Sequence, residues 1–504
     1  MPAPRSSNDL AMIAAPAGDG VRTRTHVLVG AGFALFVLLS HATFLKLPFF
    51  WDELGQFVPA ALDIFREGAW IPHSTVPNVH PPGVMAYLAA VWTVAGGYSI
   101  AATRMAMLAL GATGVVITLR LGIRLGLSRG AAVLAVGFLC ISPLFFAQAM
   151  MAQLDMPAMV FFSLALLLFL DGRMVPAALA CTALVLVKET GIVAPALFGA
   201  WLCMERHRRE ALWFVLPILP LLIWLIALER NTGHLFGNAA FATYNLWYPL
   251  HPVRLILALV RRLYYLFAGS GHCIGTAAVV LALRRTKIFG TREWRIAAAL
   301  AAAHVVLVSL LGGAELERYL LPAMPIVYIG FAAALWQASV RLRVAGAGAI
   351  LAALLTANFV NPPYPFPLEN NLAFTDFVGL HAEAGRYLEV RFPDAKIAAM
   401  FPLASELRRP DFGYVQRPLH VREIYNCSAE NVAPLAREDV AVLLLYSETW
   451  DLLGLMRNPR WTAFLRRYYE YELPVNASQV RVLLGAQLVA RWTRHGQWIE
   501  IYKR

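Results

Sequence analysis

Two acidic motifs at the ends of apolar segments are the residues best suited to chemistry in this sequence. Asp52 and Glu53 follow the aromatic segment 47–51, and Asp155 precedes Pro157 at the start of another apolar run. Acidic side chains at membrane depth are costly to bury and usually functional. A carboxylate held at the membrane interface and enclosed by protein is well placed to act as a general base. The motifs therefore predict one catalytic site, provided that they reach the same face of a membrane.

Both motifs also allow plainer interpretations. Asp155 at a helix start would complement the helix dipole, a contribution of about 0.3–1 kcal/mol, and Asp52 and Glu53 could be solvated at a helix end. If the acids face each other, Asp155 could orient the base, position an acceptor or share a divalent cation with Asp52. The sequence has no other metal-ligand spacing, and its five cysteines form no metal or disulfide pattern. No cofactor is predicted, and a divalent cation at Asp52 and Asp155 stays open.

Three basic residues supply the opposite charge. His80 precedes two prolines, Lys188 separates two apolar runs, and Arg318 opens a short segment that ends in Pro322. Individually, His80 could lie in a turn, and Lys188 and Arg318 could extend their charged ends to the membrane interface. Beside two acids they instead form a site for an anionic head group, because phosphate is bound by point charges and forked donors. The set predicts a phosphate-bearing lipid whose tail lies between membrane spans.

The composition is that of a protein with many membrane spans. The 504-residue chain is 59% hydrophobic and 15% charged, with a mean hydropathy of +0.59. A soluble protein of this length does not need so much apolar sequence. The net charge of +12 comes from 43 Lys and Arg against 31 Asp and Glu. These basic residues fall in short loops between apolar runs, as orientation signals do, so nucleic acid is not a predicted partner and membrane lipid is.

Apolar runs divide the first 360 residues into predicted spans. About eleven transmembrane helices are predicted, at 26–47, 104–124, 131–151, 156–171, 174–188, 190–204, 211–229, 262–283, 296–313, 319–338 and 344–360. The first run is too long for a cleaved signal peptide, which makes it a retained span after a cytoplasmic tail over 1–25. The predicted transmembrane domain therefore covers residues 26–360.

Charge bias predicts which loops face the cytoplasm. A twelfth run, 82–97, is shorter than the roughly 20 residues that a membrane span needs. If it does not cross and the N-terminus is inside, every strongly basic loop faces the cytoplasm, as the positive-inside rule expects. Residues 48–102 then form a long first outer loop with interfacial helices, including an amphipathic helix over 56–70. Asp52, Asp155 and the three basic residues all reach the extracytoplasmic face.

The chain changes character after residue 360. Residues 361–367 are proline-rich and predict a stiff linker. Beyond it, 395–401 and 440–446 read as buried strands, 375–391 as an amphipathic helix and 487–502 as a closing hairpin. We therefore predict an extracytoplasmic α/β domain over 361–504, whose own sequence assigns it no chemistry.

Five short segments carry a family resemblance. They are Trp51–Glu53 with Asp63–Trp70, His80–Pro82, Ala152–Pro157, Leu186–Gly191 and Arg318–Pro322, in order over about residues 28–330. In these segments the chain resembles the C-type (membrane-embedded) glycosyltransferases that use a polyprenyl-phosphate-linked sugar. It is similar to the protein O-mannosyltransferases and the lipid A aminoarabinose transferases. The latter carry Lys-Pro-Pro where this chain has His80-Pro81-Pro82.

The resemblance implies an enzyme of the cell (inner) membrane that transfers one sugar, a hexose or pentose, at the extracytoplasmic face. Asp52 is implied as the general base, with Glu53 and Asp155 as acidic partners in catalysis. Lys188, and with it Arg318 and His80, would bind the donor phosphate. The attack of an acceptor hydroxyl inverts the anomeric centre, and charge stabilisation of the departing phosphate is expected to dominate. The acceptor, whether lipid, polysaccharide or protein, stays open.

Two other classes of protein fit parts of the pattern. A transporter or flippase of an anionic polyprenyl lipid would bind the same phosphate with the same basic residues. Alternating access, however, normally needs polar groups along the path, and the middles of these spans are nearly free of charge. A non-catalytic scaffold that presents the outer domain is the third interpretation. Transfer of a sugar by the purified protein separates the enzyme from both.

Overall fold

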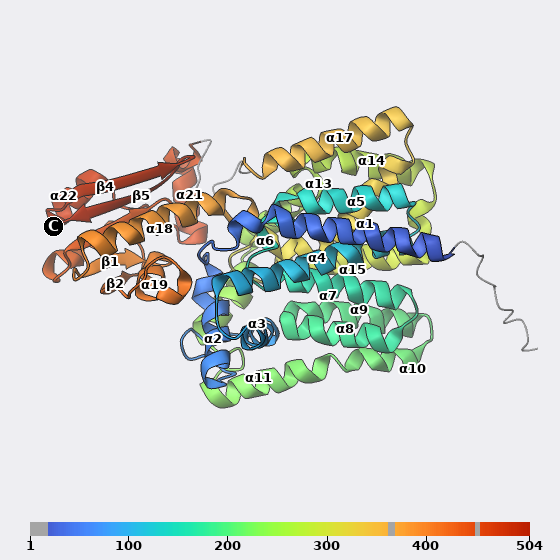
Figure 1. Cartoon of the computed structure of the whole chain (residues 1–504), viewed down its shortest axis with the longest axis horizontal. Coiled ribbons are helices and arrows are strands. Elements are labelled where there is room, and N and C mark those ends of the chain that lie inside the picture. The colour runs from blue at the N-terminus through green and yellow to red at the C-terminus, as the bar shows by residue number, and fades with distance from the viewer. Residues whose placement is uncertain (1–18, 361–367, 449–453) are drawn as a thin grey trace, which may run out of the picture.

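The computed structural model describes residues 19–360, 368–448 and 454–504. Residues 1–18 of the predicted cytoplasmic tail and the predicted linker at 361–367 lie outside the described residues. A bundle of helices makes up the first part of the chain, and a smaller domain with a β-sheet lies at one end of it (Figure 1). The mostly helical chain with a small sheet agrees with the sequence, whereas the bounds of the domains stay a prediction.

The bundle is built from helices of very different lengths. Their bounds are α1 Asp19–Ser40, α2 Val58–Glu67, α3 Gly83–Val94, α4 Ile100–Arg124, α5 Arg129–Ile141, α6 Pro143–Gln148, α7 Asp155–Leu170, α8 Met174–Val187, α9 Val193–Met204, α10 Arg208–Ala211, α11 Ile218–Thr232, α12 Ala239–Ala242, α13 Pro252–Phe267, α14 His272–Arg285, α15 Arg292–Leu310, α16 Met324–Trp336 and α17 Val340–Ala357. The short helices η2 Glu53–Phe57, η3 Glu189–Ile192 and η9 Glu317–Ala323 carry or adjoin predicted site residues.

A helix occupies each of the eleven predicted apolar runs. Among the described residues, five helices are long and apolar enough to cross a membrane, or six if α13 and α14 count as one span. The other apolar helices are shorter, so the number of crossings stays a prediction. The run predicted at 262–283 is not one straight helix. α13 and α14 meet at an angle of 45° across Gly269–Gly271, where two glycines flank Ser270 in the left-handed backbone region.

The loops that were predicted to be cytoplasmic meet at one end of the bundle. Arg124 lies 2.9 Å from Asp171 and 3.6 Å from Glu293, and Arg292 pairs with Glu205 at 2.5 Å. These contacts connect four basic loops that are far apart in sequence. Figure 1 places α10, which follows Glu205, at the end of the bundle opposite to the sheet domain. The bundle therefore has a basic end and a domain-bearing end.

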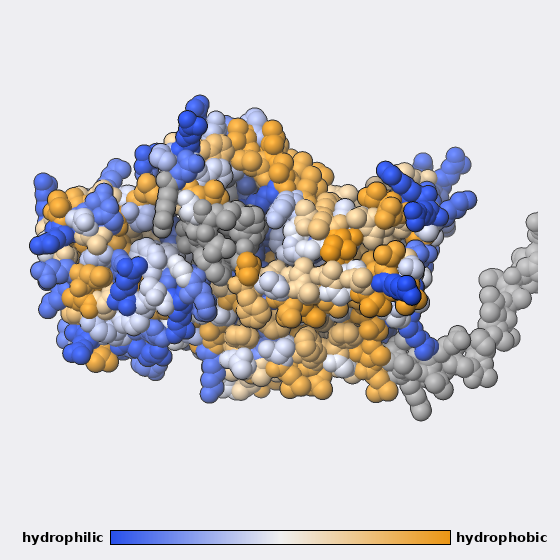
Figure 2. All heavy atoms as spheres, turned by 90° about the horizontal axis from the view of Figure 1, so that it is seen from above, coloured by the Kyte–Doolittle hydropathy of each residue, from blue (hydrophilic) through white to orange (hydrophobic). Residues whose placement is uncertain are grey.

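An apolar belt separates the two ends. Figure 2 shows hydrophobic residues around the middle of the molecule and hydrophilic residues at both extremes. Many large apolar side chains of the bundle are exposed, for example Leu35 on α1, Ile223 on α11 and Leu342 on α17. In a soluble protein such a surface would be a liability, whereas a bilayer covers it. Together with the apolar helices, the belt makes this a multi-pass membrane protein.

The first outer loop forms a small layer at the domain-bearing end. η2 and α2 replace the amphipathic helix predicted over 56–70, and α2 ends at Gly68 in the left-handed conformation. Figure 1 shows α3 nearly end on, whereas α4, α7 and α8 run along the bundle. α3 thus lies across the bundle direction, as expected for a segment that does not cross the membrane.

The C-terminal domain is a mixed five-stranded sheet with helices. Its helices are α18 Ala373–Arg391, α19 Leu403–Arg408, α20 Ala429–Val432, α21 Pro459–Tyr469 and α22 Ala477–Leu484, and its strands are β1 Ile397–Met400, β2 Val421–Ile424, β3 Val442–Tyr446, β4 Gln487–Arg494 and β5 Gln497–Lys503. The strand order is β2-β1-β3-β5-β4, with β1 parallel to β2 and β3, and β5 antiparallel to β3 and β4. The predicted helix, both buried strands and the hairpin are confirmed; β2 was not predicted.

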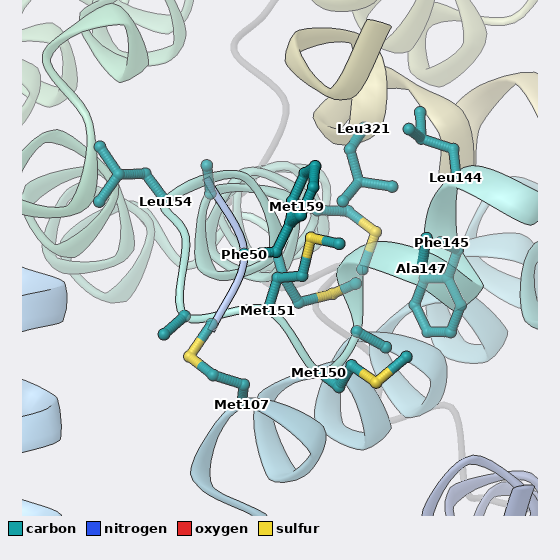
Figure 3. Packing of buried hydrophobic residues seen from close by; sticks show 14 of the residues in the cluster. Phe50, Met107, Leu144, Phe145, Ala147, Met150, Met151, Leu154, Met159 and Leu321 are labelled. Carbon is teal, nitrogen blue, oxygen red and sulfur yellow. The ribbon is translucent and has the colours of Figure 1, made fainter. Parts of the chain in front are cut away.

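A dry core supports the domain-bearing end of the bundle. Figure 3 shows Met107 of α4, Phe145 of α6, Met159 of α7 and Leu321 of η9 packed together, and all four are fully buried. Unbranched methionines fill the irregular space where short helices meet. Phe50, which is two residues before Asp52, joins the same cluster. The backbone that carries the acidic motifs is therefore anchored in close-packed side chains.

Candidate active site

A cavity of about 480 Å³ opens at the domain-bearing end of the bundle. It is lined by five of the six residues proposed from the sequence: Asp52, His80, Asp155, Lys188 and Arg318. Much of its remaining wall is apolar and comes from α11, the 236–246 segment and α15; this part contains Leu221, Leu225, Phe236, Phe241, Leu246, Leu307, Val308 and Leu311. The cavity therefore joins a charged region to a hydrophobic one.

Arg318 is the centre of the charged region. Its Nη2 donates to Oδ2 of Asp52, its Nε lies 3.1 Å from Oδ2 of Asp155, and its Nη1 donates to Oε2 of Glu369 at 2.9 Å. Lys188 Nζ donates to the other oxygen of Asp155 at 2.6 Å and lies 4.1 Å from the centre of the Tyr319 ring. The two acidic motifs, about a hundred residues apart in sequence, are thus joined by one guanidinium.

His80 lines the cavity beside this cluster. Its Nδ1 lies 2.8 Å from Oε2 of Glu189, which follows Lys188 directly. The helix after His80 packs tightly against this turn, because a Cβ at Gly83 would lie 2.4 Å from the Leu186 carbonyl oxygen. A carboxylate on Nδ1 fixes the orientation of the ring. His80 Nε2 then remains for a ligand in the cavity.

A line of amides connects Asp52 to His80. Gln56 Nε2 donates to Oδ1 of Asp52 at 3.4 Å, and Asn78 Nδ2 donates to Oε1 of Gln56 at 3.2 Å. Asn78 Oδ1 accepts the backbone N–H of His80 at 3.0 Å. Of the two amides, Gln56 lines the cavity, so that the cavity has an uncharged polar residue in addition to Lys188 and Arg318. Amides of this kind suit hydroxyl groups, which both donate and accept hydrogen bonds.

Glu53 does not line the cavity. Its side chain is fully buried, and its Oε1 accepts from Arg104 Nη1 and from the Ala152 backbone N–H at 2.6 Å. Its Oε2 accepts from Arg104 Nη2 at 3.1 Å and from the backbone N–H of Phe50 at 2.8 Å. Glu53 therefore ties the first outer loop to α4 and to the 150–152 segment, and its geometry is that of a structural ion pair.

Glu369 is the main site residue that the sequence did not indicate. It lies in η10, Leu368–Asn370, near the start of the predicted C-terminal domain, and its side chain is 3% exposed. Burial raises the pKa of Glu369, although Arg318 opposes this change. No local pattern marks this residue, since it follows the proline-rich segment and lies outside every apolar run. Only the fold brings it to Arg318.

The contacts of Asp52 and Asp155 bear on whether these two carboxylates could bind a divalent cation. Asp52 and Asp155 share Arg318, and Asp155 also accepts from Lys188. Lys188 and Arg318 thus contact three of the four carboxylate oxygens of Asp52 and Asp155, so the arrangement does not fit a metal between them. In the described part of the chain, the one group with metal-compatible spacing is Asp63, Glu67 and His73, outside the cavity.

Comparison of the sequence with protein-family models and with curated proteins finds no match. Similar solved structures do exist. ArnT from Cupriavidus metallidurans bound to undecaprenyl phosphate has a TM-score of 0.52 at 14% identity, over 96% of this chain and 98% of that protein. The oligosaccharyltransferase AglB from Archaeoglobus fulgidus, in complex with an inhibitory peptide and a dolichol-phosphate, has a TM-score of 0.51 at 10% identity, over 84% and 69%.

The Pmt1–Pmt2 protein O-mannosyltransferase complex of S. cerevisiae has a TM-score of 0.34, which is too low to support an argument. The two likenesses above 0.5 cover most of this chain. At such low identity they establish the architecture and not the reaction. The chain has the fold of the C-type membrane glycosyltransferases.

Proposed function

We propose that the protein transfers a sugar from a polyprenyl-phosphate donor to an acceptor hydroxyl, with inversion at the anomeric carbon. The observation that carries this proposal is the meeting of Asp52, Lys188 and Arg318 in one cavity that has a hydrophobic wall. Lys188 and Arg318 can bind a phosphate, and the hydrophobic wall can bind an isoprenoid chain. The carboxylate of Asp52 can accept a proton. The fold, shared with ArnT bound to undecaprenyl phosphate, supports the same choice.

In the proposed reaction, Asp52 accepts the proton of the acceptor hydroxyl while the oxygen attacks the anomeric carbon. The bond between that carbon and the phosphate oxygen breaks, and the phosphate leaves with the electron pair. Lys188 and Arg318 stabilise its negative charge, and His80 Nε2 contributes a third donor. Fixed donors aimed at developing charge in a water-poor site are usually the largest catalytic term. Asp155 contacts both Lys188 and Arg318 and so holds the two basic side chains next to each other.

A flippase or transporter would use the same phosphate ligands. The contacts of the charged groups favour the enzyme. A protein that only binds an anionic head group does not require a carboxylate in the binding cavity. The side chain of Asp52 is 18% exposed and lines the cavity, as a general base must. The opposite end of the bundle pairs its own acids with arginines, as in Arg124 with Asp171, and lacks a second site of the same kind among the described residues.

We further propose that the cavity and the C-terminal domain are extracytoplasmic, with 82–97 in the outer loop. In a variant without native cysteines, Val482→Cys, which replaces an exposed side chain of α22, should react with an impermeant thiol reagent added to intact cells. Arg208→Cys at the basic end should react only after permeabilisation, because basic loops remain in the cytoplasm. The opposite labelling pattern would invert the proposed orientation.

Lys188→Ala should weaken binding of the donor phosphate about ten- to a hundredfold, because removing a charged hydrogen-bond partner costs about 1.5–3 kcal/mol. Arg318 still compensates Asp155, so the variant should fold. The measurement is the amount of anionic polyprenyl lipid that copurifies with the protein, identified by mass spectrometry. Lys287→Ala, an exposed lysine outside the cavity, is the matched control. Equal lipid in the Lys188 variant and wild type would remove the phosphate assignment.

A further inference from the structure

Glu369 holds Arg318 from the side that faces away from the cavity. Arg318 lines the cavity, whereas Glu369 does not, and the contact runs from Nη1 to Oε2 at 2.9 Å. The other nitrogens of the guanidinium face Asp52 and Asp155. One cation is therefore shared by three carboxylates, of which only Asp52 and Asp155 line the cavity.

The segment around Glu369 is fixed in the bundle. Asn370 Nδ2 donates to Oε2 of Glu317 at 2.6 Å, and Gln148 Nε2 donates to the Glu369 carbonyl oxygen at 3.3 Å. Gln153 Nε2 lies 3.4 Å from the Glu369 carboxylate. Residues 369 and 370 thus bind the neighbouring residues 317 and 318 of η9. Such contacts can set the position of Arg318, because buried hydrogen bonds hold the segments on both sides.

The C-terminal domain also holds the turn before Asp52. The ring of Phe50 packs against Phe377 at 5.4 Å, and the ring of Trp51 lies 5.5 Å from that of Phe401. The hydroxyl of Tyr414 donates to the Phe49 carbonyl oxygen at 2.7 Å. Both partners of the ion pair between Asp52 and Arg318 are therefore supported by residues that lie after the predicted linker.

We propose that Glu369 is a positioning residue that competes with Asp52 for Arg318, and that the docked C-terminal domain thereby keeps Asp52 basic. This inference rests on the proposed function. A carboxylate that shares its cation is paired more weakly and accepts a proton more readily than one that holds the cation alone. The same competition lowers the effective positive charge that Arg318 offers to the donor phosphate. Glu369 therefore lowers the affinity for the donor and raises the turnover.

The test replaces Glu369 by Gln, which keeps the shape and one oxygen acceptor and removes the charge. Glu369→Gln should bind undecaprenyl phosphate about fivefold more tightly, since a charged hydrogen bond is roughly twice as strong as a neutral one. Its kcat should fall about tenfold, because Asp52 is then held more firmly by Arg318. A side chain with only a structural role would not tighten phosphate binding. Unchanged or weaker binding in Glu369→Gln would overturn the proposal.

Two further variants separate charge from folding. Glu369→Asp keeps the charge and should retain phosphate affinity within about twofold of wild type; tightening equal to that of Glu369→Gln would overturn the proposal. Glu406→Gln disrupts a comparably buried pair of the same domain, in which His381 Nδ1 lies 2.8 Å from Oε2 of Glu406. It should leave phosphate affinity unchanged, and a matching increase would assign the effect to the domain as a whole. Failure of the wild type to bind undecaprenyl phosphate would instead refute the proposed function itself.

Discussion

Asp52→Asn is expected to lower turnover about a hundred- to ten-thousandfold, the usual contribution of general-base catalysis. Asparagine keeps the shape and a hydrogen-bond acceptor for Arg318 but cannot take the proton of the acceptor hydroxyl. Binding of the donor phosphate should persist, because Lys188 and Arg318 remain. Turnover and donor binding are measured on the same detergent-purified sample, whose folding is checked by size-exclusion and thermal unfolding.

Asp171→Asn is the matched control for Asp52→Asn, since Asp171 also pairs with an arginine but lies at the basic end of the bundle. Its turnover should equal that of wild type. If Asp52→Asn retains near-normal turnover, Asp52 is not the base. If instead Glu53→Gln is folded and inactive while Asp52→Asn is active, the roles of the two neighbours are exchanged.

Glu53→Gln is expected to destabilise the protein by about 3–5 kcal/mol, because it leaves Arg104 as a buried charge without its partner. Both side chains of this pair have no exposed surface. The loss should be seen as a lower midpoint of thermal unfolding, whereas the turnover of each folded molecule should stay close to wild type. The double variant Glu53→Leu with Arg104→Met should recover much of the stability, because apolar replacement of a whole buried pair is often neutral. Wild-type stability in Glu53→Gln would contradict the structural role.

The sequence was sufficient to place the acids and the basic residues at one end of the molecule. Charge bias between loops is a long-range signal that does not depend on side-chain packing, and it brought Asp52, Asp155, Lys188 and Arg318 to one face. The family resemblance pointed to Asp52 rather than Glu53 as the base, but the sequence did not show that Glu53 is buried away from the cavity. Trp51 adopts a left-handed backbone conformation (φ 46°), and the turn that follows directs one carboxylate to the cavity and the next to Arg104.

Other features depend on contacts that no local pattern encodes. Glu369 and Glu189 become site residues only because the fold places them against Arg318 and His80. The break at Gly269–Gly271 lay inside one apolar run, and hydropathy alone cannot distinguish a bent pair of helices from a single span. The ion pair between Arg104, near the start of α4, and the fully buried Glu53 also depends on the fold.

The most direct test of the proposed reaction is sugar transfer by the purified full-length protein from a polyprenyl-phosphate-linked sugar. A labelled donor is supplied with extracted lipid, polysaccharide and protein acceptors, and Asp52→Asn serves as the inactive control. The account predicts that label enters one acceptor fraction, that one polyprenyl phosphate is released for each sugar transferred, and that the new glycosidic bond has the inverted anomeric configuration. Movement of the intact lipid-linked sugar across a vesicle membrane, equal in wild type and Asp52→Asn and without release of polyprenyl phosphate, would contradict it.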